Sequence, residues 1–470
     1  MTFEWEQLFP IESLPDRRLR ERAIRIGEAA TERPGAAMTA AFDDWRDTRT
    51  AYNFVANRRI SFGMLMDTAT TAVGRGLQQL PEGTTVLNVQ DTTEINLSHL
   101  QSMTGLGEIG NPKNRGLFLH PSLAISNDGV PIGLLSAQVW DRPPAEHGKA
   151  KDRKEVSFEE KESLRWWTAI QEAETRVARP GLLLHVADRE SDIYEVFHRA
   201  REAGHRILLR AAQDRRVQGE HKTLWAQVTS FCPCDQARPL SVPARPPKNG
   251  KPARAARDTS VVVRYGPVTL RGRRVSETVA MWAVEVTEVD PPTGVEPIEW
   301  LLLTSEPVTS TTQAWQQVDW YRCRWRIEEF FQVLKSGCRI EARQFESRAN
   351  YETALVFALL AAVRILGMVK QARVTPDAPA SVVLSEEEQL VLTRHAESNG
   401  NRAQGAPPLR LSEAVILIAK LGGYKNRSCD GPPGWITLWR GLRRLEDMVE
   451  GSRLARSPTP GPRPRHVDET

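Results

Sequence analysis

The chain has 470 residues, of which 40% are hydrophobic and 26% are charged, and its formal net charge is +4. The length predicts roughly three domains with a sizeable core, and the composition is typical of a soluble globular protein. A pI near 8.8 permits nucleic acid as a partner without requiring it. Five cysteines make a poor disulfide framework, and Cys232-Pro233-Cys234 lacks the spacing of a zinc knuckle, so we expect reduced thiols and a cytoplasmic protein.

No segment predicts secretion or membrane insertion. The first residues carry neither a basic stretch nor an apolar one, so we expect no signal peptide. The longest apolar run, 354–369, is interrupted by Arg364 and is too short to span a bilayer. We predict that it is a buried core helix.

Residues 1–75 are predicted to form a helical N-terminal domain. Asp16 caps a run that begins at Arg17, and further helices are expected at 39–57 and 62–80. Their arginines and aromatic residues suit a module that docks on DNA phosphates. An ordinary helical cap with solvated arginines is the alternative.

The core, 76–370, alternates strands and helices. Strands are predicted at 84–90, 117–125, 130–139, 182–187 and 206–210, and helices at 158–177 and 191–203. A three-strand meander followed by helix, strand, helix and strand is the ribonuclease H-like order. The fold class is therefore α/β, with a mixed-sheet catalytic core. Asp91 follows the first strand and Asp188 follows the fourth.

From about 225 to 295 a β-rich insertion of short segments is expected, with one cluster of basic residues. Its members are Arg245, Lys248, Lys251, Arg254, Arg257, Arg264, Arg271, Arg273 and Arg274. Only Asp258 opposes them before Glu277, so this segment is either a solvated loop or a track for a phosphodiester backbone. Residues 371–456 are predicted to be a helical C-terminal domain, and 457–470 a disordered tail.

The segment 321–335 contains no Gly or Pro and is predicted to be one helix. At about 100° per residue, Tyr321, Arg324, Glu328 and Lys335 fall within roughly 60° of one another. Taken alone, this face is more often a solvated surface with an Arg–Glu pair.

Asp91, Asp188 and Glu328 are three carboxylates from separate elements. Mg²⁺ and Mn²⁺ prefer oxygen ligands, and two such ions can activate a hydroxyl and stabilise a leaving oxygen in phosphoryl transfer. Each Asp alone would more often be a cap or turn residue, and the strand order is what favours a metal site.

Asp91-Thr92-Thr93, Asp188-Arg189-Glu190-Ser191-Asp192 and Tyr321-x2-Arg324-x3-Glu328-x6-Lys335 resemble the motifs of one family. They are similar to the DDE triad and YREK signature of bacterial cut-and-paste transposases, in the insertion-sequence-four group that includes the transposon-five-like enzymes. The similarity covers almost the whole chain, more loosely over the first 80 residues and the linkers.

The resemblance implies that the enzyme binds double-stranded transposon ends as a homodimer, cuts both strands and joins the 3′ ends to target DNA. It implies no membrane partner.

 By the same resemblance, Asp91, Asp188 and Glu328 would ligate Mg²⁺, with Mn²⁺ as a substitute, and flanking-strand cleavage would pass through a DNA hairpin. Tyr321, Arg324, Lys335 and Arg210 would hold phosphates, and Trp300 would accept a flipped base. The enzyme would be a bacterial protein of the cytoplasm, associated with the nucleoid when bound to DNA.

Three alternatives stay open at this stage. A ribonuclease H-like nuclease without strand transfer needs the same carboxylates but not the Tyr321, Arg324 and Lys335 row. A domesticated DNA-binding protein has no use for three metal ligands. A glycosidase would need only two carboxylates and is disfavoured by the basic balance.

Overall fold

The computed structural model describes residues 4–110, 113–142, 157–234, 236–242, 244, 247, 253–272, 277–427 and 430–456. The predicted disordered tail and the basic residues Arg245, Lys248, Lys251, Arg273 and Arg274 lie outside these residues. The four described cysteines are free thiols, as expected.

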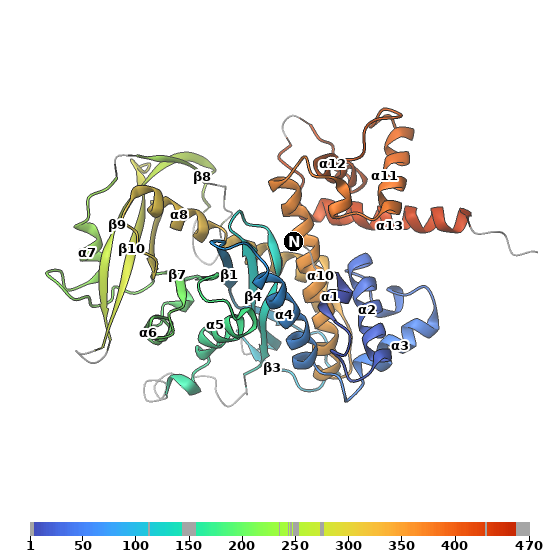
Figure 1. Cartoon of the computed structure of the whole chain (residues 1–470), viewed down its shortest axis with the longest axis horizontal. Coiled ribbons are helices and arrows are strands. Elements are labelled where there is room, and N and C mark those ends of the chain that lie inside the picture. The colour runs from blue at the N-terminus through green and yellow to red at the C-terminus, as the bar shows by residue number, and fades with distance from the viewer. Residues whose placement is uncertain are drawn as a thin grey trace, which may run out of the picture.

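One mixed sheet runs through the middle of the described part of the chain (Figure 1). Its strand order is β2-β4-β1-β6-β7-β11-β10-β9-β8, and β3 and β5 also pair with β4. The strands are β1 Val86–Gln90, β2 Thr93–Asn96, β3 Gly107–Ile109, β4 Asn114–Ser126, β5 Pro131–Trp140, β6 Leu183–Ala187, β7 Arg206–Arg210, β8 Arg238–Val242, β9 Arg257–Arg271, β10 Thr278–Val289 and β11 Glu299–Thr304.

The centre of the sheet has the predicted ribonuclease H-like arrangement. Strand β4 is antiparallel to both β1 and β5, whereas β1, β6 and β7 are parallel. Both β1 and β6 are buried along their whole length, which is why each reads as a short, mainly apolar run. The α/β fold class is confirmed. The short strands β2 and β3 were not predicted.

Helices cover the sheet and form both ends of the described part of the chain. They are α1 Trp5–Leu8, α2 Arg17–Glu32, α3 Trp45–Val55, α4 Phe62–Gln78, α5 Leu164–Val177, α6 Tyr194–Glu202, α7 Leu224–Thr229, α8 Thr311–Arg322, α9 Trp325–Gln332, α10 Arg348–Val374, α11 Glu386–Ser398, α12 Leu411–Leu421 and α13 Trp435–Arg456. Asp16 caps α2 by accepting from the Leu19 N–H, as predicted. Helix α11, which begins with a capping box at Ser385, was not predicted.

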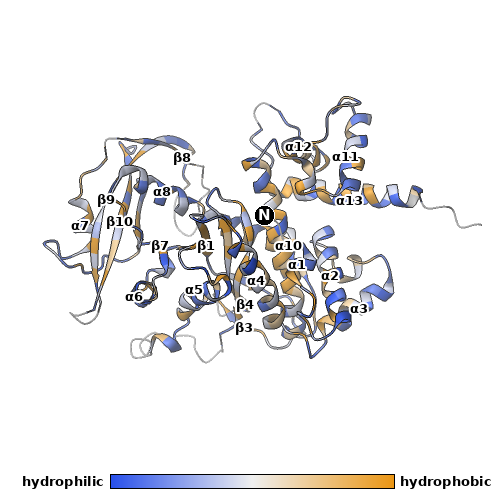
Figure 2. Cartoon of the chain, in the orientation of Figure 1, coloured by the Kyte–Doolittle hydropathy of each residue, from blue (hydrophilic) through white to orange (hydrophobic). Residues whose placement is uncertain are grey.

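Helix α10 is the central core helix (Figure 1), and Figure 2 shows it as hydrophobic along most of its length. At 27 residues it is longer than the predicted 354–369 run, and its length and composition alone would allow it to cross a membrane. However, 83% of the most apolar 18-residue segment of this helix is buried inside the fold. The aromatic rings of Trp5 and Phe54 pack on Phe357 of this helix. The prediction of a buried core helix is therefore confirmed.

The insertion differs from the expected short segments. Strands β9 and β10 have 15 and 12 residues and pair without interruption from Arg271 and Thr278 to Ser260 and Val289. Two of the basic residues face carboxylates across this pair, because Arg257 lies 2.8 Å from Glu288 and Arg264 lies 2.8 Å from Glu285. Local sequence could not show these ion pairs, since the register of the two strands creates them.

Candidate active site

Asp91 and Asp188 leave the sheet side by side. In the parallel pairing of β1 with β6, Val89 is opposite Val186. Asp91 lies two residues beyond Val89 and Asp188 two residues beyond Val186, each directly after its strand. The register therefore brings the two carboxylates to the same edge of the sheet. The two strands are distant in sequence, since the paired residues Asn88 and His185 are 97 positions apart.

Asp91 is a buried acid in a cluster of like charges. Its Oδ1 accepts from the Thr92 N–H at 2.7 Å and its Oδ2 from Arg324 Nη1 at 3.1 Å. Burial, followed by the charges of Asp188 and Glu328, raises the pKa of Asp91 to about 7 against the opposing effects of Thr92 and Arg324. Asp91 thus interacts electrostatically with the other two carboxylates predicted from the sequence.

Asp188 and Glu328 complete this cluster from two further elements. Asp188 caps the short 3₁₀ turn Arg189–Ser191 by accepting from the Glu190 N–H at 2.9 Å. Glu328 lies in the first turn of α9, and its Oε1 is 3.5 Å from Arg324 Nη1. Its side chain is 38% exposed, so it forms the solvent-facing side of the group.

Arg324 lies between two of these carboxylates. Within the described ranges, no three Asp, Glu, His or Cys side chains stand close enough together to hold a metal ion as they are placed. The donor set is nevertheless oxygen-only and its like charges repel, which is the chemistry that suits a hard divalent cation. Sharing a cation would require the Arg324 guanidinium to move away from the Asp91 and Glu328 oxygens.

The predicted DNA contacts Tyr321, Trp300 and Arg210 form a second group beside the carboxylates. The rings of Trp300 and Tyr321 are 6.2 Å apart. Burial raises the pKa of Tyr321, while Arg324 and Arg210 lower it, so both guanidinium groups lie near the phenol. Arg210 also donates to the Glu299 carbonyl at 3.1 Å. A buried phenol between two arginines is suited to hold an anionic oxygen.

The prediction of a single helix over 321–335 is wrong. Helix α8 ends at Arg322, α9 begins at Trp325, and a π turn, Val333–Gly337, follows. At the junction the Arg324 N–H donates to the Tyr321 carbonyl at 2.9 Å, a bond of 3₁₀ type that tightens the turn. Lys335 lies in the π turn with its Nζ 3.8 Å from Glu341 Oε1. The structure therefore does not place it beside Glu328 through regular helical spacing.

Sequence reasoning assigned no role to two residues near the site. Asp192, quoted only as part of a motif, is fully buried and accepts from the backbone of Ala212 and Gln213 and from Arg215 Nε, so it anchors the loop after β7. Trp325 is 57% exposed beside Arg324. The only sequence signal for Trp325 was its position next to Arg324, which belongs to the charged face described above.

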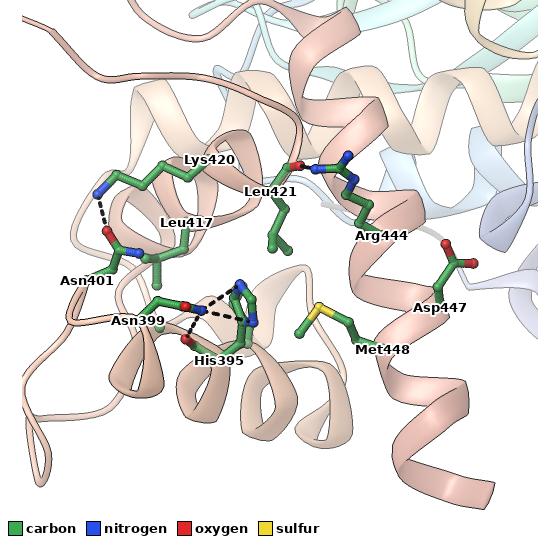
Figure 3. A pocket seen from close by; sticks show the side chains of 11 residues that line it. His395, Asn399, Asn401, Leu417, Lys420, Leu421, Arg444, Asp447 and Met448 are labelled. Carbon is green, nitrogen blue, oxygen red and sulfur yellow. Dashed lines mark hydrogen bonds between the residues drawn. The ribbon is translucent and has the colours of Figure 1, made fainter.

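A cavity of about 460 Å³ lies far from the carboxylates, among α11, α12 and α13 (Figure 3). Two of the polar groups around it already have partners. Lys420 Nζ donates to Asn401 Oδ1 at 2.8 Å, and Arg444 Nη1 donates to the Leu421 carbonyl at 2.7 Å. These bonds join the C-terminal helices, so we assign this cavity no chemistry.

Comparison with protein families gives three matches along the chain. Residues 5–60 match a transposase DNA-binding family, 146–364 match a transposase DDE domain, and 360–460 match the transposase Tn5 dimerisation domain. The segment between the first two matches contains Asp91. The assignment of that residue to the site therefore depends on its strand register and on its coupling to Asp188 and Glu328.

Proposed function

The chain belongs to the Tn5-like DDE transposases, and from this premise we propose that it cuts DNA at the inverted repeats that end its element and joins the freed 3′ ends to target DNA. Membership makes it an enzyme that cleaves DNA and transfers strands. The observation that supports the finer proposal is the register of β1 and β6, which sets Asp91 beside Asp188, together with the charge of Glu328, which acts on Asp91.

The family uses divalent metal ions, and we propose Asp91, Asp188 and Glu328 as the ligands and Mg²⁺ as the ion, with Mn²⁺ as a substitute. Bound there, the metal would activate the attacking hydroxyl and stabilise the leaving oxygen. The chain's own contribution is to present Asp91 and Asp188 directly after β1 and β6, with Glu328 in the first turn of α9.

The group beside the carboxylates would hold the DNA backbone. Arg324, Arg210 and Tyr321 offer donors to a phosphate next to the cut, and Lys335 would add a charge from the π turn. Trp300 would stack on a base flipped from a strained hairpin end, because its ring is partly buried against Tyr321 and already fixed in place.

The remaining parts would assemble the complex. DNA binding belongs to the helices of residues 1–75, the catalytic core to 76–370 and dimer formation to 371–456, consistent with the family matches at the two ends of the chain. We propose a homodimer on paired transposon ends, in the cytoplasm and on the nucleoid of a bacterium.

The test is incubation of the purified chain with DNA that carries the inverted repeats flanking its own gene, with and without Mg²⁺. Hairpin ends or strand-transfer products are expected only with the metal. Nicked DNA without joined products would instead indicate a nuclease, and shifted but uncut DNA would indicate a binding protein.

Glu328→Ala tests the ligand assignment in the same assay. It should abolish cleavage and leave binding to end DNA largely intact, because the lost group is a metal ligand. Asp319→Ala is the matched control, since Asp319 is a carboxylate on the preceding helix that pairs with the exposed side chains of Arg238 and Arg322. Mg²⁺-dependent cleavage by Glu328→Ala would contradict the assignment.

A further inference from the structure

Arg165 joins the two loops that carry Asp91 and Asp188. It lies in the first turn of α5, and only 14% of its side chain is exposed. Its guanidinium lies 5.6 Å from the ring centre of Trp140 and 5.4 Å from that of Trp166. The two indole rings therefore restrict the orientation of the Arg165 guanidinium.

Three directed hydrogen bonds use the donors of this guanidinium. Nε donates to Thr92 Oγ1 at 3.0 Å, Nη1 to the Glu162 carbonyl at 3.1 Å and Nη2 to Glu190 Oε2 at 3.3 Å. Thr92 directly follows Asp91, and Glu190 lies two residues beyond Asp188. One rigid group thus spans the loop after β1 and the loop after β6.

Behind Thr92 the network continues into the sheet. Thr92 Oγ1 is 2.9 Å from His120 Nδ1, and His120 Nε2 is 3.3 Å from Gln90 Oε1. Burial keeps the pKa of His120 well below its usual value, so the ring is neutral. A neutral imidazole has one N–H donor and one acceptor nitrogen, so one arrangement satisfies all three contacts. Arg165 donates to Thr92, Thr92 donates to His120, and His120 donates to Gln90 at the end of β1.

We propose that Arg165 is a positioning residue that sets the separation of Asp91 and Asp188 and thereby the affinity of the site for a divalent cation. The proposal rests on the metal role given to these carboxylates above. Arg165 contacts neither aspartate through a hydrogen bond in the described structure and acts through Thr92 and Glu190. A lysine could not replace it, because one ammonium on a flexible stem cannot bridge both loops as the planar fork does.

The experiment measures Mn²⁺ binding to the full chain without DNA, by electron paramagnetic resonance, together with thermal unfolding. Arg165→Met keeps an unbranched side chain between the indoles and removes all three bonds. It should weaken Mn²⁺ binding by about 10- to 100-fold, the usual effect of losing an outer partner of a metal ligand. Arg165→Lys should restore only part of the affinity. The Mn²⁺ concentration that half-saturates DNA cleavage should rise in the same order.

Arg176→Met is the matched control. Arg176 lies about three turns further along α5, is 15% exposed, and bonds Leu135 and Glu172 instead of the carboxylate loops. It should lower the unfolding temperature without weakening Mn²⁺ binding. If Arg165→Met does not fold, Glu190→Ala replaces it, because Glu190 is 62% exposed and its loss removes the β6 side of the bridge.

The outcomes separate this inference from the proposed function. Wild-type affinity in Arg165→Met or in its replacement Glu190→Ala would overturn the role of Arg165 alone. Equal weakening in Arg176→Met would do the same, since the effect would then be general destabilisation. A wild-type chain that binds no Mn²⁺ would overturn the metal site itself and, with it, the inference.

Discussion

Arg324 donates to Asp91 Oδ2 at 3.1 Å across 233 positions of the chain. The same Nη1 lies 3.5 Å from Glu328, and both Arg324 and Asp91 are 12% exposed. This guanidinium therefore opposes the burial and the like charges that raise the pKa of Asp91. It is also a cation in direct contact with two of the three proposed metal ligands.

Arg324→Ala should weaken binding to end DNA and reduce the slope of log affinity against log salt by about 1, because one phosphate contact is lost. Filter binding or fluorescence anisotropy over a range of salt concentrations measures both quantities. Arg410→Ala is the control, since Arg410 is 67% exposed and lies far along the chain at the start of α12. An unchanged slope in Arg324→Ala would return this residue to a purely structural role.

Asp192→Ala should cost about 3–5 kcal/mol of unfolding free energy, because it leaves the buried Arg215 guanidinium without its partner. The Asp192 side chain is fully buried and Arg215 is 12% exposed. Denaturant unfolding measures the change. The nearby Asp214→Ala should cost far less, since Asp214 caps the Trp225 N–H at an exposed position. Similar losses in the two variants would contradict the anchoring role of Asp192.

The carboxyl of Glu446 on α13 predicts a pH dependence of stability. Burial and then the charge of Glu32 raise its pKa from 4.5 to about 8, in spite of Arg33. The folded chain therefore holds a proton that the unfolded chain releases, so this group's contribution to stability falls as the pH rises from about 4.5 through 8.

Glu446→Gln should remove that decline. The variant should match the wild type only below pH 4.5, where the carboxyl of Glu446 is protonated in both the folded and the unfolded chain, and exceed it above pH 8. We expect a gain on the order of 1–2 kcal/mol, reduced from the full linkage value because solvent reaches the side chain. Denaturant unfolding at several pH values measures it. If the unfolding free energies of the two proteins changed with pH in the same way, Glu446 would not be the source of this pH dependence.

Gly441 should resist substitution although it lies inside helix α13. A Cβ there would collide with the Ile418 carbonyl oxygen of α12, so Gly441→Ala must push the two helices apart. We expect a loss of about 1–3 kcal/mol, measured by thermal unfolding, and weaker assembly of the dimer on DNA.

Gly451→Ala is the control on the same helix, because a Cβ at Gly451 meets nothing within 4 Å. Alanine favours a helix by up to about 1 kcal/mol over glycine, so this variant should be as stable as the wild type or slightly more stable. A stabilised Gly441→Ala would show that α12 and α13 are not held at this close approach.

Local signals predicted much of the fold. Asp16 begins α2 because a short polar side chain satisfies the first free N–H groups of a helix. The buried strands β1 and β6 read as short apolar runs with Asp91 and Asp188 just beyond them. By contrast, β2 and β3 are too short and polar to show a period, and they exist because β4 pairs with them.

The sequence by itself determined the order of the main core strands and helices and the family motifs, since periodicity, caps and motif spacing are local properties of the chain. Only the tertiary structure decided which charges meet. The register of β9 with β10 pairs Arg264 with Glu285, and the packing of α5 and α9 on the sheet brings Arg165 to Thr92 and Arg324 to Asp91. Such contacts act through space between residues far apart in sequence, so no local pattern specifies them.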